Sequence, residues 1–311
     1  MGISCTLCPR NCKVNRQIGK TGFCGQTNEI RAARAALHMW EEPCISGTNG
    51  SGTVFFSGCT LRCVYCQNSS IASGQHGKNI SIQRLSDIFL ELQDKGAHNI
   101  NLVTPTHFVP GIVRALELSK SHGLNIPIVY NTGSYESLET LRQLDGLVDI
   151  YLPDLKYYSS ELSLRYSHAK DYFDVAANAI SEMVRQAGEP IFEEQNKDAL
   201  FINAEDSDTM PLMTHGVIVR HLVLPGHTED SKKIIDYLHN TYADKIYISI
   251  MNQFTPISGL NDYPEINRKI SEAEYDEVVD YAISIGVENG FIQEGNTAEE
   301  SFIPPFDLTG I

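Results

Sequence analysis

Residues 53–68 read TVFFSGCTLRCVYCQN, a short apolar run of the kind that forms a buried strand, followed at once by three cysteines. Cys59, Cys63 and Cys66 stand four and then three positions apart, which places them together on one short loop. A structural metal site normally has four protein ligands. Three closely spaced thiols therefore leave one coordination position to be filled by something else.

Thiolates are soft ligands that suit zinc and iron–sulfur clusters. A cubane cluster with three protein thiolates leaves one iron free, and a small bidentate molecule can chelate that iron. The alternative is a zinc knuckle that takes its fourth ligand from elsewhere in the chain. The tight spacing directly after a strand favours the cluster.

The cysteines are confined to one part of the chain, because all eight lie within residues 5–66. Such clustering in a long chain indicates metal binding in a reducing compartment rather than a disulfide scaffold. A second group of four, with the count that closes a metal site, is Cys5, Cys8, Cys12 and Cys24. It fits either zinc or an auxiliary iron–sulfur cluster. Cys44 is either a small buried hydrophobe, a substitute for one of the four, or a reactive thiol.

The bulk composition excludes several classes of protein. The chain has 311 residues and a formal net charge of -15, which argues against a general nucleic-acid binder and against a binder of anionic membranes. No apolar run is long enough to span a bilayer. Residues 1–13 contain no apolar stretch of the signal-peptide type. We therefore predict a cytoplasmic protein.

Apolar runs alternate with helical patterns from residue 53 onward. The predicted strands are 53–57, 99–104, 126–131, 148–152, 216–224 and 246–251. The predicted helices are 81–95, 110–121, 135–144, 170–187 and 229–241. Such alternation indicates a parallel sheet with crossover helices. The predicted fold class is α/β, a partial (βα)6 TIM-like barrel with a Cys-rich N-terminal extension and a C-terminal closing segment.

The predicted organisation has three parts. They are a Cys-rich metal-binding segment (1–48), the partial barrel (49–260), and a closing helix with its tail (261–311). Residues 193–212 interrupt the alternation and are either an exposed insertion or a loop for substrate or partner. The closing helix, 272–285, begins with the capping-box residues Ser271 and Glu274.

Polar residues follow the predicted strands at their carboxyl ends, where a barrel of this type places its active site. They are Thr104-Pro105-Thr106-His107, Asn131-Thr132-Gly133, Asp154-Leu155-Lys156, Pro225-Gly226-His227 and Asn252-Gln253. Arg220 and His221 lie within a predicted strand close to the same edge. If Arg220 points inward, its charge needs a partner.

The Cys-x3-Cys-x2-Cys spacing after the first strand of such a barrel resembles the radical S-adenosylmethionine (SAM) superfamily. The resemblance implies that Cys59, Cys63 and Cys66 hold a [4Fe–4S] cluster whose unique iron binds the amino and carboxylate groups of SAM. It also implies that one electron from the cluster cleaves SAM and yields a 5′-deoxyadenosyl radical.

Longer phrases are similar to the pyruvate formate-lyase activating enzymes, and more closely to their PflX-like branch. They are CTLCPRNCKVNRQIGKTGFCG, HMWEEPCISGTNGSGTVFFSGCTLRCVYCQN, NINLVTPTHFVP, YLPDLKYY, IVRHLVLPGH and YPEINRKI. This resemblance implies an electron donor such as flavodoxin or ferredoxin. It also implies a hydrogen-donating target, either a glycine of a partner glycyl-radical enzyme or a small molecule.

The resemblance assigns roles to residues one by one. Asp154 and Lys156 match the Asp-x-Lys motif of the activating enzymes, in which Lys156 would neutralise the SAM carboxylate and Asp154 would help to hold a monovalent cation. Asn68 matches the Asn two places after the last cluster cysteine, near the SAM adenosine or the cluster. Arg220 would face the SAM carboxylate or a substrate anion.

Two positions depart from the pattern of the activating enzymes. Asn131 and Thr132 stand where those enzymes have Asp-Thr, and the stretch from Thr104 to Thr106 stands in place of Gly-Gly-Glu. Hydroxyl and carbonyl oxygens can accept hydrogen bonds from the SAM ammonium group without carrying a charge.

Two functions from different classes therefore compete. The first is a radical SAM enzyme, which the open coordination position favours. The second is a non-catalytic iron–sulfur electron-transfer or metal-dependent assembly protein, which the missing Gly-Gly-Glu favours. Release of 5′-deoxyadenosine separates the two.

Overall fold

The apolar runs after residue 50 form a parallel sheet in the computed structural model, which describes residues 4–193, 210–293 and 303–311. The parallel strands are β2 (Ser51–Phe56), β4 (Ile100–Val103), β5 (Ile128–Thr132), β6 (Ile150–Pro153), β8 (Met213–Leu222), β9 (Tyr247–Met251) and β10 (Gly290–Ile292). They lie side by side in the order β10-β9-β8-β6-β5-β4-β2. The strands from β2 to β9 confirm the six predicted strands, and β10 adds a short one at the edge.

The centre of this sheet is buried on both faces. Every residue of β2, β4, β5 and β6 is buried, as their continuous apolar runs predict. Val54 of β2 pairs with Leu102 of β4, and Leu102 pairs in turn with Tyr130 of β5. This register brings the carboxyl ends of neighbouring strands to one edge of the sheet.

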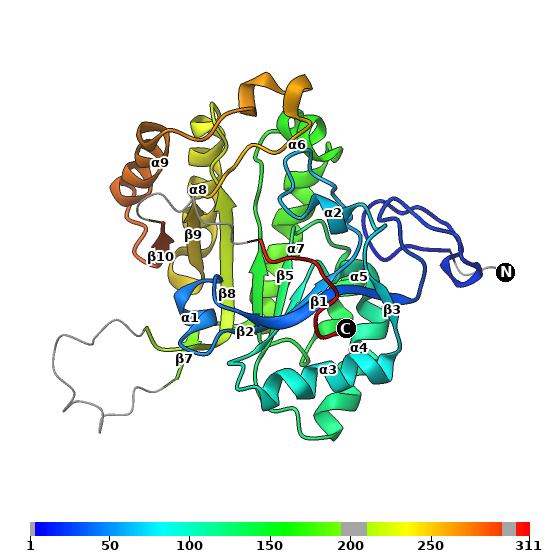
Figure 1. Cartoon of the computed structure of the whole chain (residues 1–311). Helices are drawn as coiled ribbons and strands as arrows, with labels where there is room; N and C mark the ends of the chain where they lie inside the picture. The colour runs from blue at the N-terminus through cyan, green and yellow to red at the C-terminus, as the bar shows by residue number, and fades with distance from the viewer. Residues whose placement is uncertain (1–3, 194–209, 294–302) are drawn as a thin grey trace, which may run out of the picture.

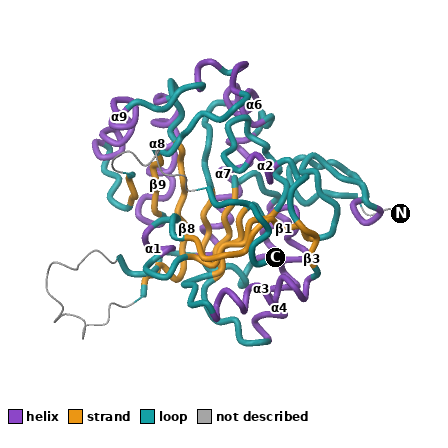
Figure 2. Tube along the Cα trace, viewed as in Figure 1, coloured by secondary structure: helices purple, strands orange, loops and turns teal. Residues whose placement is uncertain are grey.

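Helices connect the parallel strands, because a parallel pair needs a long crossover. The helices are α1 (Pro43–Ser46), α2 (Ser69–Ala72), α3 (Ile82–Asp94), α4 (Val109–Ser121), α5 (Leu138–Leu141), α6 (Ser160–Ser167), α7 (Tyr172–Ala187), α8 (Thr228–Tyr242) and α9 (Glu272–Ser284). The prediction for 135–144 was too long, since only α5 and a 3-10 turn (Arg142–Leu144) form there. Helix α6 was not predicted. The longer helices lie around a core of strands (Figure 2), so the fold is the predicted partial α/β barrel.

Three antiparallel strands, which the sequence did not predict, complete the sheet of the described residues. They are β1 (Ile30–His38), β3 (Lys78–Ile80) and β7 (Ile191–Phe192). Strand β1 pairs with β2 on one side and with β3 on the other, and β7 pairs with β8. The predicted insertion 193–212 begins just after β7, and its residues 194–209 lie outside the described part of the chain.

A C-terminal segment lies along β1, far from it in sequence (Figure 1). The Ala35 N–H group donates to the Thr309 carbonyl at 2.8 Å, and the Leu308 N–H group donates to the Ala33 carbonyl at 3.1 Å. Segments from the predicted first and third parts thus pair with each other on the barrel sheet. The division at residues 48 and 260 stays a prediction.

The predicted closing helix is confirmed as α9. Its capping box is complete, with Ser271 accepting from the Glu274 N–H group and the Glu274 side chain accepting from the Ser271 N–H group. Helix α9 packs against α8, and the chain then adds β10 beside β9. Among the described residues, no helix combines the length and the apolar character needed to cross a membrane.

Candidate active site

The carboxyl edge of the sheet surrounds a cavity of about 250 Å³. Its walls include Cys59, Cys63 and Cys66 from the loop after β2. They also include all the other residues predicted for this site, namely Asn68, Thr104, Thr106, Asn131, Thr132, Asp154, Lys156 and Arg220. The structure thus brings the predicted residues together, although they come from five separate segments.

Two of the three cysteine sulfurs of this loop accept hydrogen bonds from nearby N–H and O–H groups. Cys59 Sγ accepts from the N–H groups of Leu61 at 3.3 Å and Arg62 at 3.5 Å, and Cys63 Sγ accepts from Ser167 Oγ at 2.9 Å. Burial raises the pKa of the Cys63 thiol, and it raises that of Cys66 to about 12. The thiols therefore stay protonated without a metal, and binding of a metal charge would convert them to thiolates.

These thiols fit a cubane cluster, because each of its three protein ligands binds a different iron and the sulfurs need not converge on one point. The entry to the loop is also fixed. Gly58 has φ +88°, and a Cβ atom there would lie 2.5 Å from the Cys24 carbonyl oxygen. Only glycine fits this turn, and the contact places the N-terminal segment directly against the cluster loop.

Arg220 connects several polar side chains that line the cavity. Arg220 donates from Nε to Asp154 Oδ1 at 3.0 Å, from Nη1 to Glu41 Oε2 at 3.1 Å and from Nη2 to Asn131 Oδ1 at 2.6 Å. Lys156 Nζ lies 2.6 Å from the second oxygen of Asp154. The sequence-based expectation that an inward-pointing Arg220 needs a partner is met by two carboxylates.

The charges of this network depend on one another. Burial favours the neutral form of Asp154, but Lys156 and Arg220 outweigh it and hold the pKa of that carboxyl below its ordinary value. Burial also raises the pKa of Glu41, and Arg220 only partly opposes this effect. Desolvation disfavours charged Lys156, yet Asp154 raises the pKa of its ammonium group. The site therefore places two cations beside the ionised Asp154 and beside Glu41, whose pKa burial raises.

Sequence reasoning missed Glu41. It lies in the WEEPC segment between β1 and α1, and its side chain is only 8% exposed. Glu41 Oε1 accepts from Asn101 at 2.9 Å and from Asn131 at 3.4 Å. No periodicity marks this residue in the sequence. The pair of acidic residues just before Pro43 was the available signal.

Sequence reasoning also missed Glu136, which ties two strand ends together. Its Oε1 atom accepts from Thr106 Oγ1 at 2.6 Å and from the hydroxyl of Thr132. Burial raises the pKa of Glu136, against the opposing effect of these hydrogen bonds. Both threonines therefore donate to Glu136. Thr132 Oγ1 also accepts from the Ser134 N–H group at 3.2 Å, so each hydroxyl oxygen keeps at least one lone pair to accept from a ligand in the cavity.

Thr104 adopts a backbone conformation that β-branched residues rarely take. Its φ is +57°, in the left-handed region, while its N–H group donates to the Asn131 carbonyl at 2.9 Å. A left-handed non-glycine residue costs about 1–3 kcal/mol. Strained residues of this kind cluster at ligand sites, and Thr104 lines the cavity.

The three histidines that the sequence placed near this edge do not line the cavity, and each is hydrogen-bonded elsewhere. His107 hydrogen-bonds the Ser57 carbonyl at 2.7 Å, and burial lowers its pKa to about 3. His221 is held between the Leu155 carbonyl and Ser231, both at 2.8 Å. His227 lies 3.0 Å from the Tyr166 hydroxyl.

The N-terminal cysteine segment folds into hydrogen-bonded turns beside the barrel. The Cys5 N–H group donates to the Val14 carbonyl at 3.0 Å, and the Phe23 N–H group donates to Cys12 Sγ at 3.3 Å. Burial and the neighbouring thiols raise the pKa of Cys8 to about 12. Within residues 4–193, 210–293 and 303–311, no three His, Cys, Asp or Glu side chains converge as they would around a single ion.

Arg10 fastens this segment to the cluster loop. Its Nε atom donates to the Thr60 carbonyl at 2.8 Å and its Nη2 atom donates to the Ser167 carbonyl at 2.9 Å. The same guanidinium lies over the ring of Phe23, 4.0 Å from its centre. Cys44, in contrast, is fully buried in a separate apolar cluster with residues such as Ile45 and Val129, as expected for a small hydrophobe.

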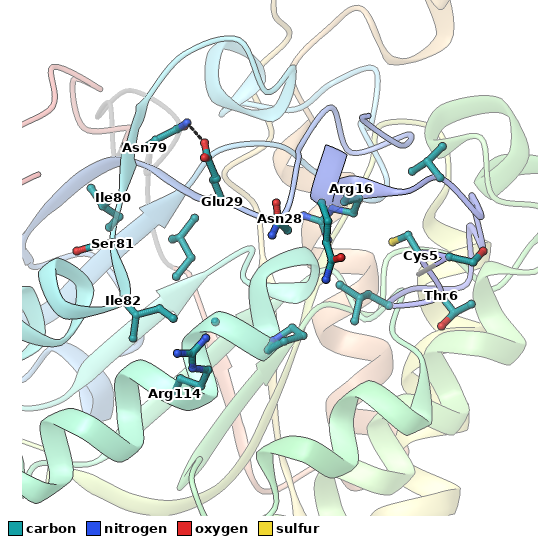
Figure 3. A pocket seen from close by; sticks show the side chains of 17 residues that line it. Cys5, Thr6, Arg16, Asn28, Glu29, Asn79, Ile80, Ser81, Ile82 and Arg114 are labelled. Carbon is teal, nitrogen blue, oxygen red and sulfur yellow. Dashed lines mark hydrogen bonds between the residues drawn. The ribbon is translucent and has the colours of Figure 1, made fainter. Parts of the chain in front are cut away.

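A larger cavity of about 830 Å³ lies away from this edge, between the N-terminal segment, the start of β1 and helix α4 (Figure 3). Cys5 lies on its N-terminal wall, and Arg114 of α4 lies on the opposite side. None of the residues predicted for SAM or for the cluster at Cys59, Cys63 and Cys66 lines this cavity, so it is separate from the site described above.

Comparison with known proteins agrees with this geometry. The model of the radical SAM superfamily matches residues 53–238, which is more than half of the chain. The uncharacterized protein MJ0674 of Methanocaldococcus jannaschii is 29% identical over 289 residues, covering 90% of this chain and 74% of that protein.

Two solved structures show the same fold. The FeFe-hydrogenase maturase HydG of Carboxydothermus hydrogenoformans has a TM-score of 0.51 at 14% identity, over 79% of this chain and 54% of that one. Streptococcus suis SuiB, bound to its precursor peptide SuiA, has a TM-score of 0.50 at 13% identity, over 78% and 48%. The chain thus spans about half the length of both. Because the superfamily model covers the cysteine loop and the strands that carry the cavity, the chain belongs to the radical SAM superfamily.

Proposed function

We propose that this radical SAM enzyme cleaves SAM reductively at a [4Fe–4S] cluster held by Cys59, Cys63 and Cys66, and that the 5′-deoxyadenosyl group then abstracts hydrogen from a target. Membership of the superfamily implies the cluster and SAM. The observation that supports the proposal most is a single cavity lined by three thiols and by the Asp154, Lys156 and Arg220 network.

The cavity residues divide between the two ends of the SAM amino acid group. Lys156 faces the carboxylate, and Asp154, which Arg220 holds in place, keeps Lys156 in its charged state. Thr104 and Thr106 accept from the ammonium group, and Asn68, Asn131 and Thr132 complete the polar wall. This division follows the sequence resemblance to the activating enzymes and is consistent with the observed network.

The proposed target and partners also follow that resemblance. We infer that the chain, which is similar to the PflX-like branch, acts as the activating enzymes do and removes hydrogen from a glycine of a partner glycyl-radical enzyme. A low-potential donor such as flavodoxin or ferredoxin supplies the electron. A small-molecule target is the competing possibility, and deuterium transfer into 5′-deoxyadenosine from labelled partner or labelled metabolites separates the two.

The reaction itself is tested with the reconstituted protein under anaerobic conditions. Reduction with dithionite in the presence of SAM should release 5′-deoxyadenosine and methionine. A protein that assembles a reducible cluster, binds SAM and yet releases no 5′-deoxyadenosine would contradict the proposal. That result would favour the electron-transfer or assembly protein considered above.

Replacement of Lys156 by alanine should weaken SAM binding and leave the cluster in place. A charge-assisted hydrogen bond to a carboxylate contributes roughly 1.5–3 kcal/mol. The expected loss of SAM affinity is therefore about 10- to 150-fold. Equilibrium SAM binding and iron content measure the two effects separately. Lys170→Ala, at an exposed lysine outside the cavity, is the control. An unchanged dissociation constant in Lys156→Ala would show that the residue has only a local structural role.

We also propose that Cys5, Cys8, Cys12 and Cys24 bind a second metal, either zinc or an iron–sulfur cluster, mainly to stabilise the N-terminal segment. Metal analysis of the anaerobically purified protein should give one zinc or about four irons beyond those of the barrel cluster. Cys8→Ala should remove this metal and expose residues 4–30 to protease, while the barrel cluster persists. Cys44→Ala, at a thiol in a separate apolar cluster, should change neither result. Native protein without extra metal, and with all four thiols open to alkylation, would refute this site.

A further inference from the structure

A chain of buried hydroxyl groups ends on a cluster cysteine. The Tyr65 and Tyr157 hydroxyls are 2.6 Å apart, the Tyr157 hydroxyl is 2.7 Å from Ser167 Oγ, and Ser167 Oγ is 2.9 Å from Cys63 Sγ. Tyr157 and Ser167 are completely buried, and Tyr65 is 5% exposed on the cavity wall. None of these hydroxyls has a part in the proposed binding of SAM.

The direction of this chain is determined by its last acceptor. A metal-bound thiolate at Cys63 carries no hydrogen, so it can only accept, and Ser167 must donate its single hydroxyl hydrogen to the sulfur. Tyr157 then donates to Ser167, and Tyr65 donates to Tyr157. Each hydroxyl carries a single hydrogen, so the last acceptor settles the order of donation along the whole chain. All the hydroxyl dipoles therefore point toward Cys63.

The position of Ser167 is rigidly held. It is the last residue of α6, which ends at His168 with φ +54°. The Val64 N–H group donates to the Tyr166 carbonyl at 2.9 Å, and Arg10 donates to the Ser167 carbonyl at 2.9 Å. Backbone and side-chain contacts thus fix the end of α6 against the loop that carries Cys63. A donor held this firmly reaches the sulfur without a large entropic cost.

We propose that Ser167, positioned by Tyr157 and Tyr65, raises the reduction potential of the cluster through its hydrogen bond to Cys63 Sγ. A reduced cluster carries one more negative charge, part of which lies on its sulfur ligands, so a donor to sulfur stabilises the reduced state more than the oxidised state. Polarisation along a buried chain of hydroxyls strengthens its last bond. The inference rests on the proposed cluster at Cys59, Cys63 and Cys66.

The test is an anaerobic redox titration of the reconstituted protein without SAM, followed by the EPR signal of the reduced cluster. Ser167→Ala should lower the equilibrium constant for one-electron reduction about tenfold, or about 59 mV in midpoint potential. Tyr157→Phe should lower the midpoint potential by a smaller amount. Ser167→Thr keeps a hydroxyl donor, so its midpoint potential should stay close to that of the wild type. Ser163→Ala is the matched control, because Ser163 is a buried serine of the same helix whose hydroxyl donates to the Ser160 carbonyl at 3.2 Å.

Equal potentials for Ser167→Ala and Ser163→Ala would overturn the proposal. If Ser167→Ala assembles too little cluster to titrate, Tyr157→Phe decides alone: a potential below that of Ser163→Ala supports the proposal, and an equal one refutes it. The readout needs no SAM cleavage, so it can succeed even if the proposed reaction fails. A wild-type protein that assembles no cluster would refute the proposed function and this inference together.

Discussion

Replacement of Cys63 by alanine should abolish the barrel cluster and reduce 5′-deoxyadenosine release to the background of the assay. The loop between β2 and α2 carries only the three thiols of the site, so no fourth thiol there can take over. Cys63 Sγ also receives the Ser167 hydroxyl, so the alanine variant loses both an iron ligand and the acceptor of a buried donor. Iron content, the EPR signal and product analysis measure the loss.

Cys44→Ala is the matched control for this experiment, because Cys44 is a buried cysteine outside the cavity. It should retain the cluster and the activity. Cys59→Ala and Cys66→Ala should behave like Cys63→Ala. Normal SAM cleavage by a purified, reconstituted Cys63→Ala variant would show that the radical reaction does not depend on this cluster.

Arg220→Met should destabilise the folded protein by roughly 3–5 kcal/mol, because it leaves buried carboxylates without their common partner. Asp154 keeps Lys156, but Glu41 loses the only cation within salt-bridge distance among the described residues. Denaturant unfolding measures the loss. Adding Glu41→Gln should recover part of the stability, since it removes the uncompensated charge. Arg185, an exposed arginine that also contacts two carboxylates, provides the control, and Arg185→Met should have a much smaller effect.

The destabilisation by Arg220→Met should depend on pH in a defined direction. Burial raises the pKa of Glu41 even with Arg220 present, and loss of the cation raises it further. In the folded variant Glu41 therefore binds its proton at a higher pH than it does in the unfolded chain, where the pKa of a glutamate is about 4.3. The free energy of unfolding of the variant should therefore rise as pH falls from 8 toward 5. The difference in this free energy between wild type and Arg220→Met should become smaller over the same range. A constant difference over that range would contradict this account.

The parallel half of the fold was predictable from sequence because its strands are continuous apolar runs. The antiparallel strand β1 was not, since IRAARAALH is rich in alanine and arginine and carries no alternating pattern. It becomes a strand because β2, β3 and the segment around Thr309 offer hydrogen-bond partners on its edges. Contacts between distant segments thus override local propensity.

The site residues that were predicted are marked by local sequence patterns, whereas those that were missed depend on contacts between distant segments. Residues that follow a strand or lie near its end, such as Asp154 and Arg220, could be placed near one edge from the strand pattern alone. Glu41, Glu136 and Ser167 lie between or at the ends of other elements, and only the folded chain brings them to the cavity residues. The left-handed conformation of Thr104 was equally hidden, because the sequence offers a threonine where glycine would be expected.

The pairing of β1 with residues 308 and 309 has a consequence for synthesis on the ribosome. Strand β1 leaves the exit tunnel early, whereas the segment that hydrogen-bonds Ala33 and Ala35 emerges only after the whole barrel. At the usual pace of translation this interval is on the order of tens of seconds. Throughout it, part of the β1 edge exposes open backbone donors and acceptors, which are sites for pairing with other nascent chains. When the C-terminal segment docks, it pairs with this edge, and Asp307 forms an ion pair with Arg34 at 2.8 Å. The edge is then no longer available for pairing with other chains.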